Sequence, residues 1–281
     1  MKKEMTTTVL AIVLVFLVII TGSFIIKNMS GVSPPFTVVE SESMQHSNES
    51  QIGIIDTADM ILVRTYDRAN PSSYVEGFHN GTKEFGDYGS VIIYKRPAGN
   101  PVIHRAILWM EYNGVTWSAP SLEFFNDENG NPLWGGDSTD FNDLHGNLTL
   151  TLKSDYRDRE VTVRVNDLVY ESGYITMGDN NSNIDQNSSN ISYNRLVNPD
   201  RIKSVAWKEI PWIGAIKLAF NGNMNRVNHN VPNTVPCLAA FFTTMILIVI
   251  SMGLFLDYRV IRNKETKHPH PFISTGKKKK G

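Results

Sequence analysis

Hydrophobic and polar positions divide the chain into three parts. Residues 8–26 are nineteen residues without a charge, and residues 231–256 form a second uncharged stretch. At about 1.5 Å per residue, a helix over the first stretch is roughly 29 Å long, close to the hydrocarbon thickness of a bilayer. The pattern predicts two transmembrane helices that flank a polar segment of about 200 residues.

The first stretch has an alternative interpretation as a cleaved signal peptide. Its apolar run is long, and no small-x-small cleavage site clearly follows it, which favours a retained helix. The second stretch has no such alternative and is expected to span the membrane.

Short β-rich runs separated by turn signals fill the segment between the two stretches. LTLTLK from Leu148 and VTVRV from Val161 alternate apolar and polar residues with the period of a half-buried strand. Further β-rich runs begin at Met60, Ser90, Val102 and Tyr174. No part of this segment shows a long 3.6-residue apolar period. The sequence therefore predicts a mostly β fold: a β domain with one N-terminal and one C-terminal transmembrane helix.

The charges beside the two apolar stretches predict the orientation of the chain. Residues 257–281 hold eight positive charges and two negative ones, Asp257 and Glu265. Ahead of the first stretch, the positive Lys2 and Lys3 outnumber the negative Glu4. The positive-inside rule then places both termini in the cytoplasm. We expect a two-span protein of the cell membrane, with an extracytoplasmic β domain and a basic cytoplasmic tail over 257–281.

Composition excludes several classes of protein. Lys and Arg number 27 against 28 Asp and Glu, which gives no general reason to expect nucleic-acid binding, and the single cysteine excludes a disulfide framework or a cysteine-built zinc site. Neither a metal nor another cofactor is expected. Residues 31–230 hold 25 acidic and 16 basic residues, with glycosylation sequons at Asn48, Asn80, Asn147, Asn187 and Asn190. These sequons agree with an external position for the segment.

Three short motifs carry candidate chemistry. TVVESESMQHS, which begins at Thr37, places Ser41 and Ser43 two residues apart after an apolar strand end. In an extended segment, residues two apart share a face and can point at one ligand. SVIIYKRPAGNPVIHRAI, which begins at Ser90, is expected to form two strands with His104 on the second.

The third motif, TMGDNNSNID, begins at Thr176 and presents Asp179 and Asp185 from a tight turn and the loop after it. Each motif also has an ordinary structural explanation. Serines near a strand end are commonly turn formers, a histidine in a β-rich run is commonly a core residue, and an Asx-rich loop commonly caps itself.

SESM at Ser41–Met44, VIHRAI at Val102–Ile107 and MGDNNSNID at Met177–Asp185, in this order behind an N-terminal span, resemble type I signal peptidases. The resemblance is to the archaeal and endoplasmic-reticulum branch, where a His replaces the Lys of the bacterial enzymes. It covers residues 8 to about 108 and 174 to 219. It implies a signal-peptidase-like β catalytic domain that cleaves exported precursors after small residues at the membrane surface.

The resemblance also implies roles for individual residues. Ser43 matches the nucleophile and His104 the general base, while Asp185 matches the acid that orients or stabilises this base and Asp179 the acid of the GDNN turn. Ser41 matches a position whose hydroxyl helps the oxyanion hole of the bacterial relatives, beside the backbone N–H of Ser43. A serine hydroxyl needs a neighbouring base to take its proton, and a carboxylate fixes the tautomer of that base. Which of the two aspartates contacts His104 stays open.

Two further questions stay open at this stage. His46, three residues after Ser43, is a rival base, and many signal peptidases have proline at its position. The segment IPWIGAIKLAF, from Ile210, fits either an interfacial segment or a core strand.

The spacing of 75 residues between His104 and Asp179 is large for the family. Residues 109–173 are therefore expected to form an inserted β subdomain, and the catalytic domain is expected to comprise residues 31–108 and 174–230.

Two functions fit these observations. The first is a membrane-bound serine endopeptidase that removes signal peptides through an acyl-enzyme, using a Ser/His dyad supported by Asp. Its partners are exported precursor proteins, the lipid bilayer and, by extension, the secretion translocon. The second is a non-catalytic two-span cell-surface glycoprotein related to signal peptidases. The enzyme is favoured because a competent residue fills every catalytic position.

Overall fold

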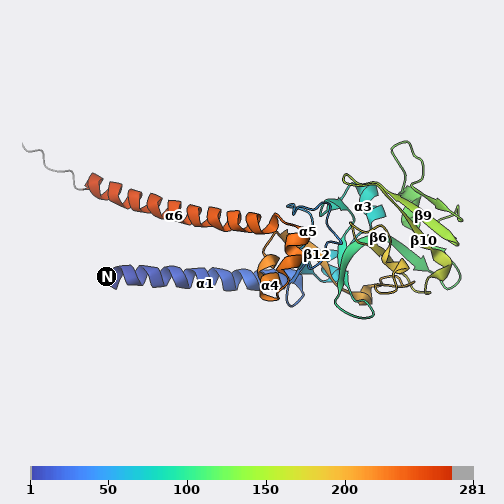
Figure 1. Ribbon diagram of the computed structural model, residues 1–281, viewed down its shortest axis with the longest axis horizontal. Helices are drawn as coiled ribbons and strands as arrows, with labels where there is room; N and C mark the ends of the chain where they lie inside the picture. The colour runs from blue at the N-terminus through green and yellow to red at the C-terminus, as the bar shows by residue number, and fades with distance from the viewer. Residues whose placement is uncertain (1, 268–281) are drawn as a thin grey trace, which may run out of the picture. The chain divides into compact units, whose positions relative to one another are not determined.

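A computed structural model describes residues 2–267 of the chain (Figure 1). The terminal lysine run of the expected tail, residues 277–280, lies outside the described residues. The chain divides into two compact units, Met1–Val235 and Pro236–Gly281. The fold is mixed α/β rather than mostly β, because six α-helices accompany a curled antiparallel sheet in the described part of the chain.

The secondary-structure elements follow one another in a simple order. The helices are α1 Lys2–Ser30, α2 Tyr66–Ala69, α3 Tyr74–Asn80, α4 Gly214–Phe220, α5 Met224–Asn230 and α6 Thr234–Lys267. The strands are β1 Phe36–Val38, β2 Met60–Arg64, β3 Lys83–Glu84, β4 Asp87–Tyr88, β5 Val91–Tyr94, β6 Val102–Tyr112, β7 Trp117–Ser118, β8 Trp134–Gly136, β9 Asn147–Leu152, β10 Arg159–Arg164, β11 Gly173–Met177 and β12 Ile202–Ile210. Four 3₁₀ turns, η1 Pro120–Phe124, η2 Val165–Asp167, η3 Asp185–Asn187 and η4 Pro199–Arg201, lie in the loops.

The main sheet runs in the order β1-β2-β12-β5-β6-β11 and curls into a half-barrel, with β7 paired to the far end of β6 (Figure 1). All pairings in this sheet are antiparallel. The eleven-residue strand β6 pairs with β5, β7 and β11, so it connects the two halves of the sheet. The six strand-like runs of the sequence all contain strands, although the strand in the run from Val161 ends at Arg164 and η2 begins at Val165.

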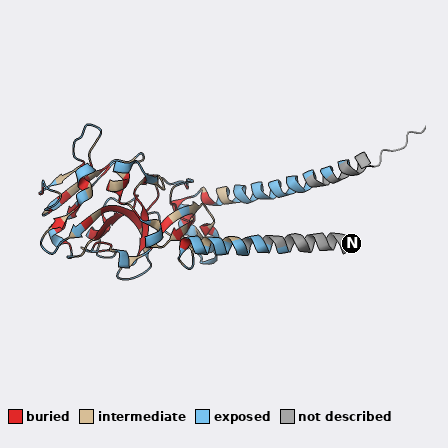
Figure 2. Cartoon of the chain, turned by 180° about the vertical axis from the view of Figure 1, so that it is seen from behind, coloured by how far each residue is buried: buried red, intermediate tan, exposed pale blue. Residues whose placement is uncertain are grey.

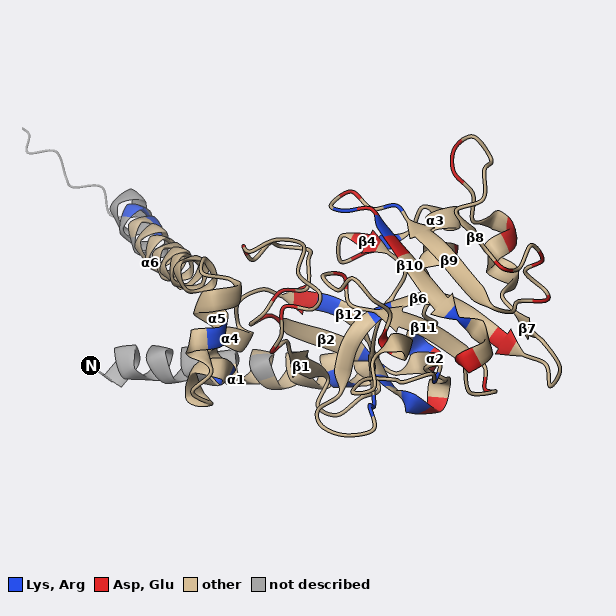
Figure 3. Ribbon diagram, turned by 45° about the vertical axis from the view of Figure 1, so that its right-hand side comes forward, with Lys and Arg blue, Asp and Glu red and all other residues tan. Residues whose placement is uncertain are grey.

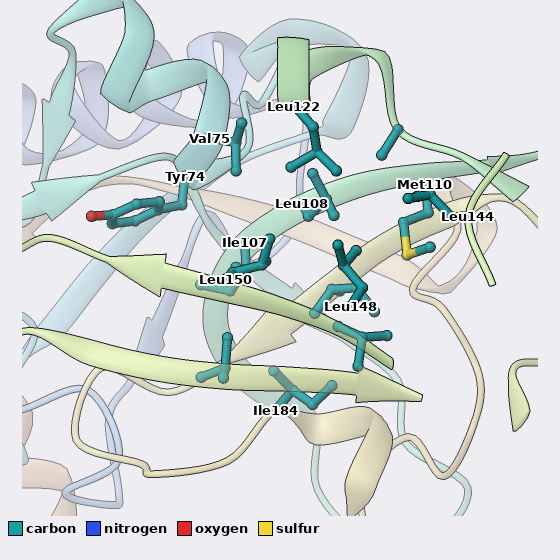
Figure 4. Close-up of a cluster of buried hydrophobic side chains, with 14 of the residues drawn as sticks. Tyr74, Val75, Ile107, Leu108, Met110, Leu122, Leu144, Leu148, Leu150 and Ile184 are labelled. Carbon is teal, nitrogen blue, oxygen red and sulfur yellow. The ribbon is translucent and has the colours of Figure 1, made fainter. Parts of the chain in front are cut away.

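The expected insertion, 109–173, contains a separate three-stranded sheet of order β10-β9-β8. Its strands alternate buried and solvent-facing residues, as their sequences predict. The buried leucines and valines of β9 and β10 belong to the same hydrophobic cluster as Ile107, Leu108 and Met110 of β6 (Figure 4). Each such fully buried side chain contributes about 1.5–3 kcal/mol. The small sheet therefore shares its core with the main sheet.

Buried residues are concentrated in the strands of the curled sheet (Figure 2), and the loops that carry the sequence motifs contribute single buried residues such as Met44, Asp179 and Asp185. The cluster beneath the first motif contains Met44 at 1% exposure, with Val39, Ile55 and Val91. Helix α3 begins with a capping box between Ser73 and Glu76 and buries its first turn against η1 and β6. A helix of seven residues is too short to leave a clear apolar period in the sequence.

The segment IPWIGAIKLAF ends strand β12 and then forms a helix. A turn over Pro211–Ile213 leads into α4, which buries Gly214, Ala215 and Leu218 and leaves Phe220 88% exposed. The alternative of a core strand over Ile210–Phe220 is therefore wrong.

Two long helices contain the apolar stretches of the sequence. Within the described residues, α6 is the one helix that is long and apolar enough to cross a membrane. The 22 residues Thr234–Phe255 carry no charge (Figure 3), and most of their side chains are solvent-exposed in the structure (Figure 2). Helix α1 contains a shorter apolar segment, Phe16–Ser30. Helix α6 continues to Lys267, so the first eleven residues of the expected tail are helical.

Candidate active site

His104 and Asp185 form a buried pair. His104 lies in β6 and is 3% exposed, and Asp185, at the start of η3, is 1% exposed. The ring Nδ1 of His104 lies 2.8 Å from Oδ2 and 2.9 Å from Oδ1 of Asp185. A carboxylate in this position accepts a hydrogen bond from Nδ1–H and leaves Nε2 as the basic nitrogen. The geometry thus answers the question left open by the sequence: Asp185, not Asp179, contacts the imidazole.

A buried tyrosine extends this pair. The hydroxyl of Tyr94 donates to Asp185 Oδ2 at 2.6 Å, and the hydroxyl of Thr176 donates to the Tyr94 oxygen at 3.2 Å. Burial, followed by the negative charge of Asp185, raises the pKa of Tyr94 well above its usual value. Tyr94 therefore stays protonated and fixes the orientation of the carboxylate.

The sequence contained a signal for Tyr94 that the motif analysis missed. In the antiparallel register of β5 and β6, Ile92 lies opposite His104. Tyr94 is two residues from Ile92, so its side chain is on the same face of the sheet as the imidazole.

Ser43 lies in a turn that two buried residues hold in place. Residues 41–44 are bends and turn rather than the expected extended segment. The hydroxyl oxygens of Ser41 and Ser43 are nevertheless 3.3 Å apart. Met44 enters the core, and the amide of Gln45 binds Thr57 and the carbonyl of Asn230. Within the described chain, the backbone N–H of Ser43 donates to no protein acceptor.

Gly178 brings the Ser43 turn and the His104 ring together. A Cβ atom on Gly178 would lie 2.5 Å from the carbonyl oxygen of Ser43 and 2.9 Å from Nε2 of His104. These two atoms are therefore at most 5.4 Å apart, the sum of the two distances. The next residue but one, Asn180, donates its backbone N–H to the same Ser43 carbonyl at 2.9 Å.

Ser43 and His104 are near each other but are not hydrogen-bonded in the described part of the chain. In the described part of the chain, no hydrogen bond joins the Ser43 hydroxyl to His104, and the recorded contact of that hydroxyl is with Ser41. Such catalytic hydrogen bonds are often long in enzymes without substrate and tighten when it binds. Rotation of the Ser43 side chain changes the direction of its hydroxyl without moving the turn.

Asp179 has a different role from Asp185. Its carboxylate accepts two hydrogen bonds from Arg105, from Nε at 2.8 Å and Nη2 at 2.6 Å, and one contact from Nε2 of His46 at 3.0 Å. Burial raises the pKa of Asp179, but the charge and hydrogen bonds of Arg105, with His46, lower it more, so it lies below its usual value. Asp179 is a charged anchor for a fully buried arginine.

Residues of the insertion also hold the Asp179 turn. The backbone carbonyl of Asp179 accepts hydrogen bonds from Tyr156, Arg157 and Arg159. The ring of Tyr156 stacks on His46, with 3.6 Å between the centroids. The insertion thus contributes directly to the walls of the site.

His46, the alternative candidate for the base, has other partners for its ring. Its Nε2 contacts Asp179, its ring stacks on Tyr156, and within the described chain it forms no hydrogen bond to Ser43. The structure brings His104, Asp185, Ser41 and Ser43 together and places Asp179 and His46 in a neighbouring polar network.

Among residues 2–267, no group of three or more His, Cys, Asp or Glu side chains could hold a metal ion. Comparison of the chain with models of known families, with curated proteins and with solved structures found no match.

Proposed function

We propose that this protein is a membrane-bound serine endopeptidase of the signal peptidase type, which removes signal peptides from exported precursors. The observation that carries the proposal is the buried His104–Asp185 pair, whose Nε2 faces the Ser43 turn across Gly178. A buried carboxylate behind an imidazole, with a serine beside the other ring nitrogen, is the arrangement that activates a hydroxyl for acyl transfer.

The proposed reaction has two halves. The Ser43 hydroxyl oxygen attacks the carbonyl carbon of the scissile bond, its proton passes to Nε2 of His104, and the peptide C–N bond breaks as His104 protonates the leaving amine. The signal peptide is then an ester of Ser43. A water molecule gives a proton to His104 as its oxygen attacks the ester carbon. The bond from this carbon to Ser43 Oγ then breaks, and His104 returns the proton to Oγ, which releases the signal peptide and the free serine.

Two donors are available for the oxyanion that forms in each half. They are the backbone N–H of Ser43, which has no acceptor in the described chain, and the hydroxyl of Ser41, 3.3 Å from that of Ser43. Removal of one such donor typically raises the barrier by about 3–4 kcal/mol.

The proposed function includes anchoring of the enzyme in the membrane from which its substrates emerge. We propose that α6 and the apolar part of α1 are two spans, with both termini in the cytoplasm and the β domain outside, as the flanking charges predict. The cleavage site of a signal peptide emerges at the same surface, and confinement of enzyme and substrate to one surface raises their effective concentration.

Processing of an exported precursor by detergent-solubilised protein tests the function. Wild type is expected to cleave the precursor, and Ser43→Ala is expected not to. His104→Ala should lose activity, while His46→Ala should retain it at reduced stability because Asp179 loses a partner. Absence of cleavage by wild type would favour the non-catalytic glycoprotein, and retention in His104→Ala with loss in His46→Ala would reverse the assignment of the base.

A further inference from the structure

A polar pocket lies beside the catalytic pair. Its volume is about 810 Å³, and Asp185 forms part of its wall. The other lining residues come from the loop after β11 and from the end of β10, and most carry amide or hydroxyl groups: Arg164, Asn180, Asn181, Ser182, Asn183, Ile184, Asn187, Ser188, Ser189 and Ile191. A large pocket next to reacting groups is a natural place for substrate.

The charge of this pocket is set by one residue. Arg164 and Asp185 are its charged lining residues, and the carboxylate of Asp185 already binds His104 and Tyr94. Arg164 has Asp167 at 3.7 Å, but the two side chains are 63% and 47% exposed. An exposed pair of this kind is weak. Arg164 is thus a positive charge at the pocket that an acidic partner can still reach.

The backbone holds Arg164 in place although its side chain is exposed. It is the last residue of β10, opposite Asn147 of β9, and its neighbours Val163 and Val165 are fully buried. The amide of Asn187, from the pocket loop, donates to the carbonyl of Thr162 in the same strand. The insertion therefore attaches to the pocket loop and places a charge beside it.

The proposed substrates have two chemically different sides. The side that precedes the cut carries an apolar region and small residues at the cleavage site. Contact of such a segment with the pocket would leave amide and hydroxyl groups without water or partners, which costs free energy. A polar segment would keep these groups hydrogen-bonded. The pocket therefore fits the residues that follow the cut.

We infer that this pocket binds the first residues of the released protein, and that Arg164 gives the enzyme a preference for an acidic side chain there. The inference rests on the proposed function and adds a specificity residue from the insertion. Arg164 acts on substrate binding, and the bond-breaking steps do not require it.

Cleavage of matched precursors tests the inference. The substrates are one exported precursor with Glu, Gln or Lys at each of the first three positions after the cut, and kcat/KM is measured for the full-length protein in detergent. Wild type is expected to cleave the best-placed Glu substrate about two- to fivefold faster than its Gln counterpart, the factor typical of one exposed charge pair. Arg164→Ala should bring this ratio close to one.

Three further variants complete the test. Arg164→Glu should make the Lys substrate the preferred one, Arg164→Lys should restore part of the preference for Glu, and Lys203→Ala, a change of an exposed cation on β12, should leave the preference as in wild type. A Glu preference that persists in Arg164→Ala, or its absence from wild type, would overturn the inference while Ser43-dependent cleavage still supports the proposed function. Absence of Ser43-dependent cleavage would overturn both.

Discussion

The Nδ1 atom of His104 lies within 2.9 Å of both carboxylate oxygens of Asp185, and both residues are almost completely buried. The pair joins a strand of the main sheet to a loop 81 residues later in the chain. Because the contact occupies Nδ1, the ring presents Nε2 toward the Ser43 turn. The orientation of the imidazole, and with it the proposed chemistry, depends on this contact.

Asp185→Asn should lower kcat by on the order of 10³ to 10⁴, because an amide N–H facing Nδ1 favours the tautomer in which Nε2 carries the proton. KM should change little. Precursor cleavage under initial-rate conditions gives both constants, with the exposed Asp200→Asn as control. An Asp185→Asn variant with more than a tenth of the wild-type kcat would contradict the assigned role.

Tyr94→Phe removes the hydrogen bond that orients Asp185 and should lower kcat about tenfold. Tyr174→Phe is the matched control, since the Tyr174 hydroxyl is also buried but donates to the carbonyl of Pro71. Both variants should unfold at a lower temperature than wild type, while loss of activity should be confined to Tyr94→Phe. Equal activities for the two variants would show that the tyrosine is merely structural.

Gly178→Ala places a methyl group 2.5 Å from the Ser43 carbonyl and 2.9 Å from His104 Nε2, which is too close for either contact. The serine turn and the imidazole must then move apart, and activity should fall at least a hundredfold, as expected for a misplacement of about 1 Å. The control is Gly135→Ala, whose added Cβ would have no neighbour within 4 Å. Full activity in Gly178→Ala would show that the two groups do not work together.

Thermal stability should fall as the pH rises from 5 to 8.5. Burial raises the pKa of Asp56 to about 7, of Asp59 to about 8 and of Glu209 to about 7. The folded state therefore holds protons that the unfolded chain releases near pH 4. This contribution to stability is complete below that pH and is lost as the pH passes 7 to 8. Unpaired buried oxygens on Asp56 and Glu209 agree with protonated carboxyls.

Circular dichroism melting across this range measures the effect, and Asp59→Asn should flatten the pH dependence. The range begins at pH 5 because Asp179, whose pKa is lowered, contributes stability that is lost on the acid side. A melting temperature that increases up to pH 8.5 would contradict the assignment of these three raised pKa values.

The elements that sequence predicts well are those with local patterns. The alternation of apolar and polar residues in the runs at Leu148 and Val161 predicted β9 and β10. The order of the motifs predicted that His104 and Asp185 lie in one site, and the two side chains are in contact. Helix α4 was missed as a helix because Pro211 and the short length of the segment hide its period.

The polar network around Asp179 could not be predicted in the same way. Arg105 is fully buried, and it binds Asp179 and backbone carbonyls from the 84–89 loop. A charged residue in a strand pattern usually faces solvent. Its burial depends on acceptors that the fold gathers from distant parts of the chain, including Asp179, 74 residues away.

The most direct test of the account is an acid quench of the full-length protein during precursor cleavage, followed by mass measurement of its proteolytic fragments. The account predicts that the mass of the fragment containing Ser43 increases by the mass of the signal peptide less one water, and that Ser43→Ala shows no such adduct. An adduct on another residue, or precursor cleavage by Ser43→Ala at the wild-type rate, would contradict it.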